Sequence, residues 1–159
     1  MRTSLPGTLE RGIRLREAGE LEEARTVLLE LLQVDPEDPA VNYQCAWVHD
    51  RMGLEREAIP LYERAIGRGL SGADLEGAIL SLGSSYRAVG DSAKAAAVLR
   101  GGVARFPRNR AMRVFLAMAL YDRDEHDQAV DFCSATSPRP AQTRRSPPTK
   151  RHYPSTPTA

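Results

Sequence analysis

The chain has 159 residues, of which 42% are hydrophobic, 27% charged and 6% aromatic, and its formal net charge is +1. This composition favours one helical domain over a β-sandwich, and no apolar run approaches the ~18 residues that a membrane span needs. Two cysteines, Cys45 and Cys133, are too few for a disulfide framework, so we expect a cytoplasmic protein in a reducing compartment.

The charge is unevenly distributed along the chain. Five basic residues and no acid lie between Pro138 and Ala159, and the remaining 17 basic and 21 acidic residues give the rest of the chain a net charge of −4. A nucleic-acid-binding domain is expected to carry a basic face. We therefore expect neither nucleic acid nor a membrane as a partner.

The predicted elements are helices that come in pairs, near residues 7–34, 39–68, 73–105 and 109–136. Apolar residues recur at helical spacing, as in Val27, Leu28, Leu31 and Leu32. The first helix of each pair is expected to end at a left-handed residue: Gly19, Gly53, Gly90 and, in the last pair, Asp124. The dipeptides Asp35-Pro36 and Phe106-Pro107 end second helices, and Asp38-Pro39 starts the next pair.

These helix pairs repeat with a period of 34 residues. Ala24 and Ala58 are 34 residues apart, and so are Ala95 and Ala129. Ala58 and Ala95 are 37 apart, and the extra residues fall in the glycine-rich segment 67–76. A period of this length indicates a stack of helical repeats.

The third copy carries the clearest motif. Ile79, Leu82-Gly83, Tyr86, Ala95, Leu99 and Pro107 follow the pattern W-x₂-L-G-x₂-Y…A-x₃-F…P, with Ile in place of Trp. The chain thus resembles the tetratricopeptide repeat family, and small stand-alone bacterial members in particular. The second copy departs from the pattern with Ala46 for Gly and His49 for Tyr. The resemblance implies an all-α, right-handed superhelical solenoid of about four antiparallel helix pairs.

The predicted repeat domain covers residues 5–136, with repeats near 5–38, 39–72, 73–108 and 109–136. Small residues are expected where the two helices of a pair cross closely, because a methyl group or less fits there. One such site is Gly83, repeated by Gly12, Ala46 and Ala117. The other is Ala95, repeated by Ala24, Ala58 and Ala129. Gly102 is expected to be small because it faces the next helix.

Catalytic motifs are absent from the sequence, including phosphate-binding loops, nucleophile elbows and zinc-protease helices. We therefore predict no enzyme activity and no cofactor. Cys45 and His49 are four residues apart on one predicted helix and form half of a metal site at most, since no second pair is near to complete a tetrahedral set. Packing in the core is the favoured interpretation of both, and a metal-dependent accessory activity is a lesser alternative.

In this family the first helix of each pair lines a concave groove. The repeat phase then predicts a protein- or peptide-binding surface with these residues: Leu9, Ile13, Arg16, Tyr43, Trp47, Asp50, Arg51, Leu80, Ser84, Arg87, Val114, Met118 and Tyr121. Tyr43 and Trp47, at i and i+4, are expected to form one aromatic patch. Arg16, Arg51 and Arg87 are expected to form a basic ladder, so the predicted partner is acidic with an apolar anchor.

The segment 137–159 is rich in proline and basic residues and has no apolar periodicity, which predicts a disordered tail. It is interpreted either as an interaction tail or as a truncated or out-of-frame end. Solenoids normally close with a polar capping helix. Because the last repeat lacks one, a homo-oligomer that associates through this repeat is an alternative to the binding scaffold.

Overall fold

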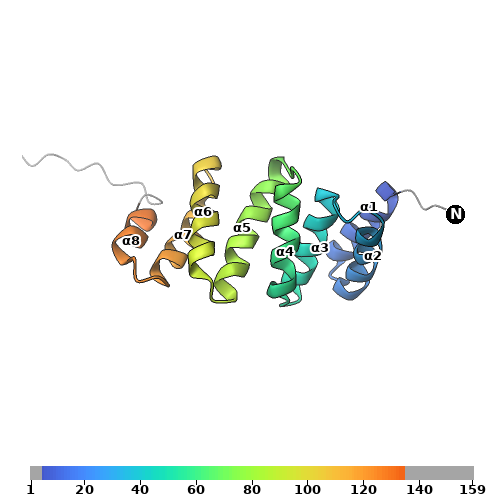
Figure 1. Cartoon of the computed structure of the whole chain (residues 1–159), viewed down its shortest axis with the longest axis horizontal. Helices are drawn as coiled ribbons and strands as arrows, with labels where there is room; N and C mark the ends of the chain where they lie inside the picture. The colour runs from blue at the N-terminus through green and yellow to red at the C-terminus, as the bar shows by residue number, and fades with distance from the viewer. Residues whose placement is uncertain (1–4, 135–159) are drawn as a thin grey trace, which may run out of the picture.

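The computed structural model describes residues 5–134, with side chains from Gly7 to Phe132. These residues contain eight helices and no strand: α1 (Leu5–Ala18), α2 (Leu21–Val34), α3 (Pro39–Arg51), α4 (Glu55–Gly67), α5 (Gly72–Ala88), α6 (Ser92–Arg105), α7 (Arg110–Tyr121) and α8 (His126–Ser134). Consecutive helices form four hairpins stacked in chain order (Figure 1). The predicted all-α stack of helix pairs is confirmed. The predicted tail, 137–159, lies outside the described residues.

The turn inside each pair is closed by a residue with positive φ. Gly19, Gly53 and Gly90 have φ values of 82°, 74° and 85°, and Asp124 has 62°. The following amide donates back across the helix end in every pair, as in Leu54 N to His49 O at 2.9 Å and Glu125 N to Leu120 O at 3.0 Å. This bond satisfies a carbonyl that the helix leaves unpaired. All four predicted ends of the first helices are confirmed.

The two helices of a pair approach closely at the predicted small residues. A Cβ atom added to Gly12 would lie 2.6 Å from Leu28 Cδ2, and one added to Gly83 would collide with the Leu99 side chain. Leu28 and Leu99 are fully buried. Each glycine therefore leaves space for a leucine of the second helix. Gly102 of α6 is crowded both within its pair and by the next one, because a Cβ there would meet Ile79 of α5 and Met112 of α7.

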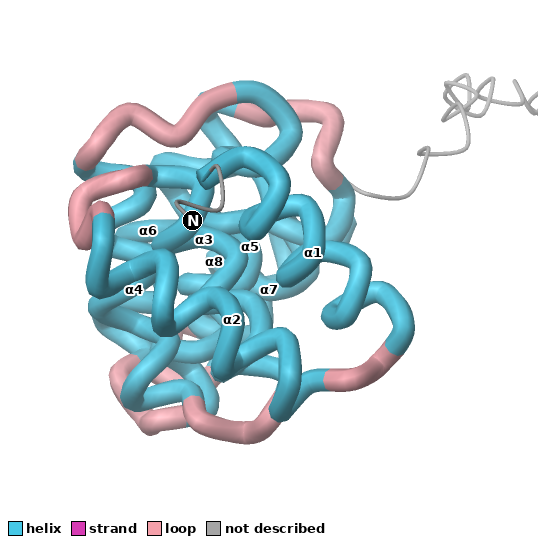
Figure 2. Tube along the Cα trace, turned by 90° about the vertical axis from the view of Figure 1, so that its right-hand side faces the viewer, coloured by secondary structure: helices cyan, strands magenta, loops and turns pink. Residues whose placement is uncertain are grey.

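The stack is held more tightly on the side of the first helices. The backbones of α1 and α3, of α3 and α5, and of α5 and α7 approach one another, whereas within residues 5–134 the backbones of successive second helices do not. A side-chain hydrogen bond from Arg100 of α6 to Gln128 of α8 bridges the last two second helices. Closer spacing of the first helices curves the stack around them, so α1, α3, α5 and α7 line its inner side. Figure 2 looks along the stack from its N-terminal end and shows α4 and α6 to the left of α1, α5 and α7.

None of the helices described has both the length and the apolar character that a membrane crossing requires.

Candidate peptide-binding groove

The predicted groove residues all belong to the first helices α1, α3, α5 and α7. Each of them except Tyr43 is at least partly exposed. The contacts among these residues divide the row into two parts. One part surrounds Trp47 on α3, and the other lies at the C-terminal end of the stack, on α7.

Tyr43 is not a surface residue, and the predicted aromatic patch of Tyr43 and Trp47 is therefore wrong. Only 8% of Tyr43 is exposed, and its ring centroid lies 6.3 Å from that of Tyr62. Its hydroxyl occupies the space beside Gly77 of α5, where a Cβ would come within 2.7 Å. Burial raises the pKa of the Tyr43 hydroxyl. The physical reason is that α5 packs against this turn of α3, whereas Trp47, one turn later, stays half-buried.

Trp47 lies between two arginines. The Arg16 guanidinium carbon is 4.5 Å from the centroid of the Trp47 ring, and that of Arg51 is 5.3 Å away. Both distances are within the range of cation–π attraction. Arg51 is exposed, whereas Arg16 is partly covered. We call Arg16, Trp47 and Arg51 the Trp47 cluster.

Gln44 positions the first of these arginines, and the sequence analysis did not identify it. Arg16 Nη1 donates to Gln44 Oε1 at 2.8 Å, and Nη2 donates to Glu17 Oε1 at 3.1 Å. Gln44 is buried, so it fixes the guanidinium beside the indole ring. Among the described side chains, Arg16 Nε is buried without a hydrogen-bond partner. In the sequence, the only sign of a role for Gln44 is that it is polar. Its burial is seen only in the structure.

The predicted basic ladder is also wrong, because its third member is neutralised. Arg87 Nε donates to Asp122 Oδ2 at 2.7 Å, and Arg87 Nη1 lies 3.9 Å from Met118 Sδ. Asp122 is the residue directly after α7, the next first helix in the stack. Arg16 is likewise paired with Glu17, at 3.1 Å, so within residues 5–134 Arg51 is the one arginine of the three without an ion pair.

Asp50 forms hydrogen bonds that join helices of the stack. Its carboxylate accepts from Ser85 Oγ at 2.9 Å and from the Tyr62 hydroxyl at 3.5 Å. Burial raises the pKa of the Asp50 carboxyl, and the Ser85 hydrogen bond opposes that shift. The residue joins α3 to α4 and α5, which holds the floor of the groove together beside Trp47.

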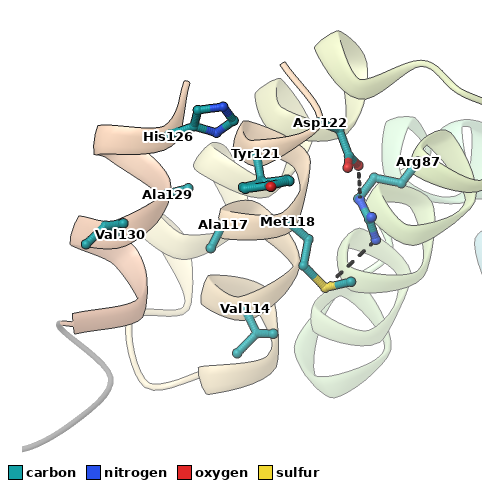
Figure 3. A pocket seen from close by; sticks show the side chains of 9 residues that line it. All are labelled: Arg87, Val114, Ala117, Met118, Tyr121, Asp122, His126, Ala129 and Val130. Atoms are coloured by element: carbon teal, nitrogen blue, oxygen red, sulfur yellow. Dashed lines mark hydrogen bonds and ion pairs between the residues drawn. The ribbon is translucent and has the colours of Figure 1, made fainter. Parts of the chain in front are cut away.

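A second concave feature lies at the C-terminal end of the stack (Figure 3). Its cavity of about 450 Å³ lies between α7 and α8 and has a mostly apolar lining. Four large apolar side chains at this end are exposed, and we call them the C-terminal apolar face: Val114 (44%), Met118 (41%), Tyr121 (65%) and Val130 (62%). The α8 residues His126, Ala129 and Val130, which also line the cavity, were not predicted. Val130 follows Ala96 by one period, and this spacing was the signal in the sequence that could have identified Val130.

Cys45 and His49 belong to the core. His49 Nδ1 donates to the Cys45 carbonyl at 2.7 Å, and Nε2 accepts from Arg25 Nε at 3.3 Å. Both ring nitrogens are therefore occupied. Burial raises the pKa of the Cys45 thiol to about 12. Within residues 5–134 no group of three or more His, Cys, Asp or Glu side chains is placed to hold a metal ion.

Comparisons with known proteins agree with this architecture. The family model described as "Tetratrico peptide repeat" matches residues 39–147. Similar solved structures include MamA, at 18% identity with a TM-score of 0.77 over 84% of this chain and 71% of that one. MamA from Desulfovibrio magneticus RS-1 also matches at 18% identity and a TM-score of 0.77, over 85% and 75% of the two chains.

YrrB, described as a TPR protein with an unusual peptide-binding site, matches at 19% identity and a TM-score of 0.74, over 81% of this chain and 65% of that chain. No curated protein matches the sequence. The family model covers more than half of the chain, and its repeat is the helix pair that the structure shows. The chain therefore belongs to the tetratricopeptide repeat family.

Proposed function

We propose that the protein is a non-catalytic scaffold that binds a protein or peptide segment along the inner face formed by α1, α3 and α5. The observation that carries this proposal is the Trp47 cluster, in which one half-buried indole ring lies beside two guanidinium groups. Tryptophan and arginine are the residues most enriched among binding hot spots. Leu9, Ile13, Leu80 and Ser84 extend the same face on either side.

The chemistry of the cluster defines the segment that would bind. An apolar side chain would pack on the part of the Trp47 ring that the arginines leave open. A neighbouring Asp or Glu would pair with Arg51, which is exposed. An arginine guanidinium can bind a carboxylate through two parallel hydrogen bonds. We therefore propose an acidic segment with an apolar anchor as the partner. The structural neighbour YrrB, with its peptide-binding site, supports this class of function. A cytoplasmic location remains part of the proposal.

The test uses the intrinsic fluorescence of Trp47, which is the only tryptophan in the chain. Peptides that pair Leu, Phe or Trp with Asp or Glu would be screened against wild type, and binders titrated by Trp47 emission and calorimetry. Trp47→Ala is expected to weaken calorimetric binding by about 2 kcal/mol, or about 30-fold in Kd. Arg51→Glu is expected to weaken it in a salt-sensitive way, because it places an acid opposite the acids of the peptide.

The matched control is Val34→Ala, which removes an exposed apolar side chain at the end of α2, away from the groove. It should leave binding unchanged. The groove assignment fails if Trp47→Ala lowers the melting temperature strongly while peptide affinity stays at the wild-type value. Trp47 would then be a core residue.

A further inference from the structure

On the first helices, the row of side chains that faces the inner side of the stack becomes apolar only in the last repeat. The corresponding positions are Ile13 and Arg16 on α1, Trp47 and Asp50 on α3, Ser84 and Arg87 on α5, and Met118 and Tyr121 on α7. The second position of each of the first three helices is charged and makes a polar contact inside the stack. On α7 it is Tyr121, which is 65% exposed.

The next helix pair covers the equivalent surface everywhere else in the stack. Ala96 of α6 is 1% exposed because α7 packs against α6, whereas Val130, one period later on α8, is 62% exposed. Val114, Met118 and Tyr121 stand at i, i+4 and i+7 on α7, which is the spacing of a helix face that packs on another helix. The residues described thus end in a face of the kind that a further helix would bury.

We propose that the C-terminal apolar face binds the same face of a second copy of the chain, with the two α7 helices antiparallel across a two-fold axis. A two-fold contact uses one patch on both partners, so the patch must be complementary to itself. Here Val114, Met118 and Tyr121 form one wall of the cavity and Ala129 and Val130 of α8 form the other, so each copy offers the same apolar surface (Figure 3). The two apolar surfaces would cover each other across the two-fold axis.

The charges at the two ends of α7 favour the antiparallel arrangement. The start of the helix is basic, with Arg108 just before it and Arg110 one turn before Val114 on the same face. In the turn after α7, Asp122 is paired with Arg87 and Arg123 with Glu125. The acids left to face a partner are therefore Asp124 and, in the first turn of α8, Asp127. Antiparallel packing brings the basic end of one helix beside the acidic turn of the other, whereas parallel packing would juxtapose like charges.

The remainder of the chain is a poorer occupant on sequence grounds. Residues 135–159 contain no proline-free run longer than the six residues 141–146, and Ala141 is the one apolar residue in that run. A helix that fills the cavity needs an apolar row over two or more turns. A second copy supplies that row.

The first test is the mass of the full chain in solution, by sedimentation equilibrium and light scattering over a range of concentrations. Wild type is expected to be a dimer with a Kd below about 100 μM. Met118→Glu should be monomeric, and Arg110→Glu should raise the dimer Kd about 10-fold because it brings acids together. Val34→Glu, which alters an exposed apolar residue elsewhere, should dimerise like wild type. Circular dichroism verifies that each variant is folded.

The second test fixes the orientation, with one cysteine introduced at a time into a Cys133→Ser background, in which the remaining Cys45 is buried, and a short bismaleimide. Met118→Cys, near the middle of α7, should be cross-linked to itself. Arg110→Cys should not, because two such residues lie more than about 15 Å apart in an antiparallel pair. A wild-type monomer at all concentrations would overturn the proposal, as would an undiminished dimer of Met118→Glu. Cross-linking through Arg110→Cys would overturn the antiparallel arrangement.

Discussion

Replacing Ala58 with arginine is expected to unfold the protein or bring it close to unfolding. Ala58 is 0% exposed and lies in α4 where that helix crosses α3. The larger side chain must either displace the neighbouring helix or bury a guanidinium without a partner. We expect a loss of about 3–5 kcal/mol, against a total of about 5–15 kcal/mol for a typical domain.

The measurement is urea unfolding followed by far-ultraviolet circular dichroism. Ala97→Arg makes the same change at an exposed alanine of α6 and should alter the free energy of unfolding by no more than about 0.5 kcal/mol. Equal stability of the Ala58 and Ala97 variants would contradict the repeat phase. That phase assigns Ala24, Ala58, Ala95 and Ala129 to one crossing site, and the first three are completely buried.

Stability is expected to fall steeply as the pH rises above about 9. Burial raises the pKa of the Cys45 thiol from 9.0 to about 12. The unfolded chain therefore loses this proton at a lower pH than the folded chain, and the folded state is penalised between the two pKa values. Each pH unit in that interval costs up to about 1.4 kcal/mol, so Cys45 alone accounts for about 2–3 kcal/mol between pH 9 and 11.

Three tyrosines act in the same direction, with their main effect at higher pH. Burial raises the pKa of the Tyr43 and Tyr62 hydroxyls, and burial together with the hydrogen bond to Glu63 raises that of Tyr86 to about 12. Their ionisation in the unfolded chain is half complete at pH 10, one unit above that of the thiol. The loss of stability between pH 9 and 10 is therefore shared between Cys45 and the tyrosines, with Cys45 the largest single contributor.

This effect is checked by urea unfolding at several pH values from 8 to 11. Cys45→Ala should lower stability at pH 8, because it leaves a small cavity, but should flatten the pH dependence between 9 and 10. Tyr86→Phe should flatten that part of the curve much less than Cys45→Ala does, and should have its larger effect above pH 10. The assignment is wrong if Cys45→Ala and wild type lose stability in parallel from pH 9 to 10.

The sequence by itself determined the architecture of this protein. The 34-residue period, the glycines at 19, 53 and 90, and the small residue at 83 predicted the helix pairs, their ends and their close approaches. Asp124 could be assigned to the fourth left-handed turn because the period placed it there, and its φ is 62°. These features either lie within one helix pair or recur from pair to pair at a nearly regular spacing. The pattern of residues along the chain is therefore enough to predict them.

Only the tertiary structure decided which groove residues remain available. The period places Tyr43 and Trp47 on one side of α3, yet α5 covers the first and leaves the second half-exposed. Arg16, Arg51 and Arg87 are separated by close to one period, yet two lie against Trp47 and the third pairs with Asp122. The period determines on which side of its own helix a side chain lies. Its exposure and charge balance depend on side chains that the neighbouring repeat supplies, and those vary from one repeat to the next.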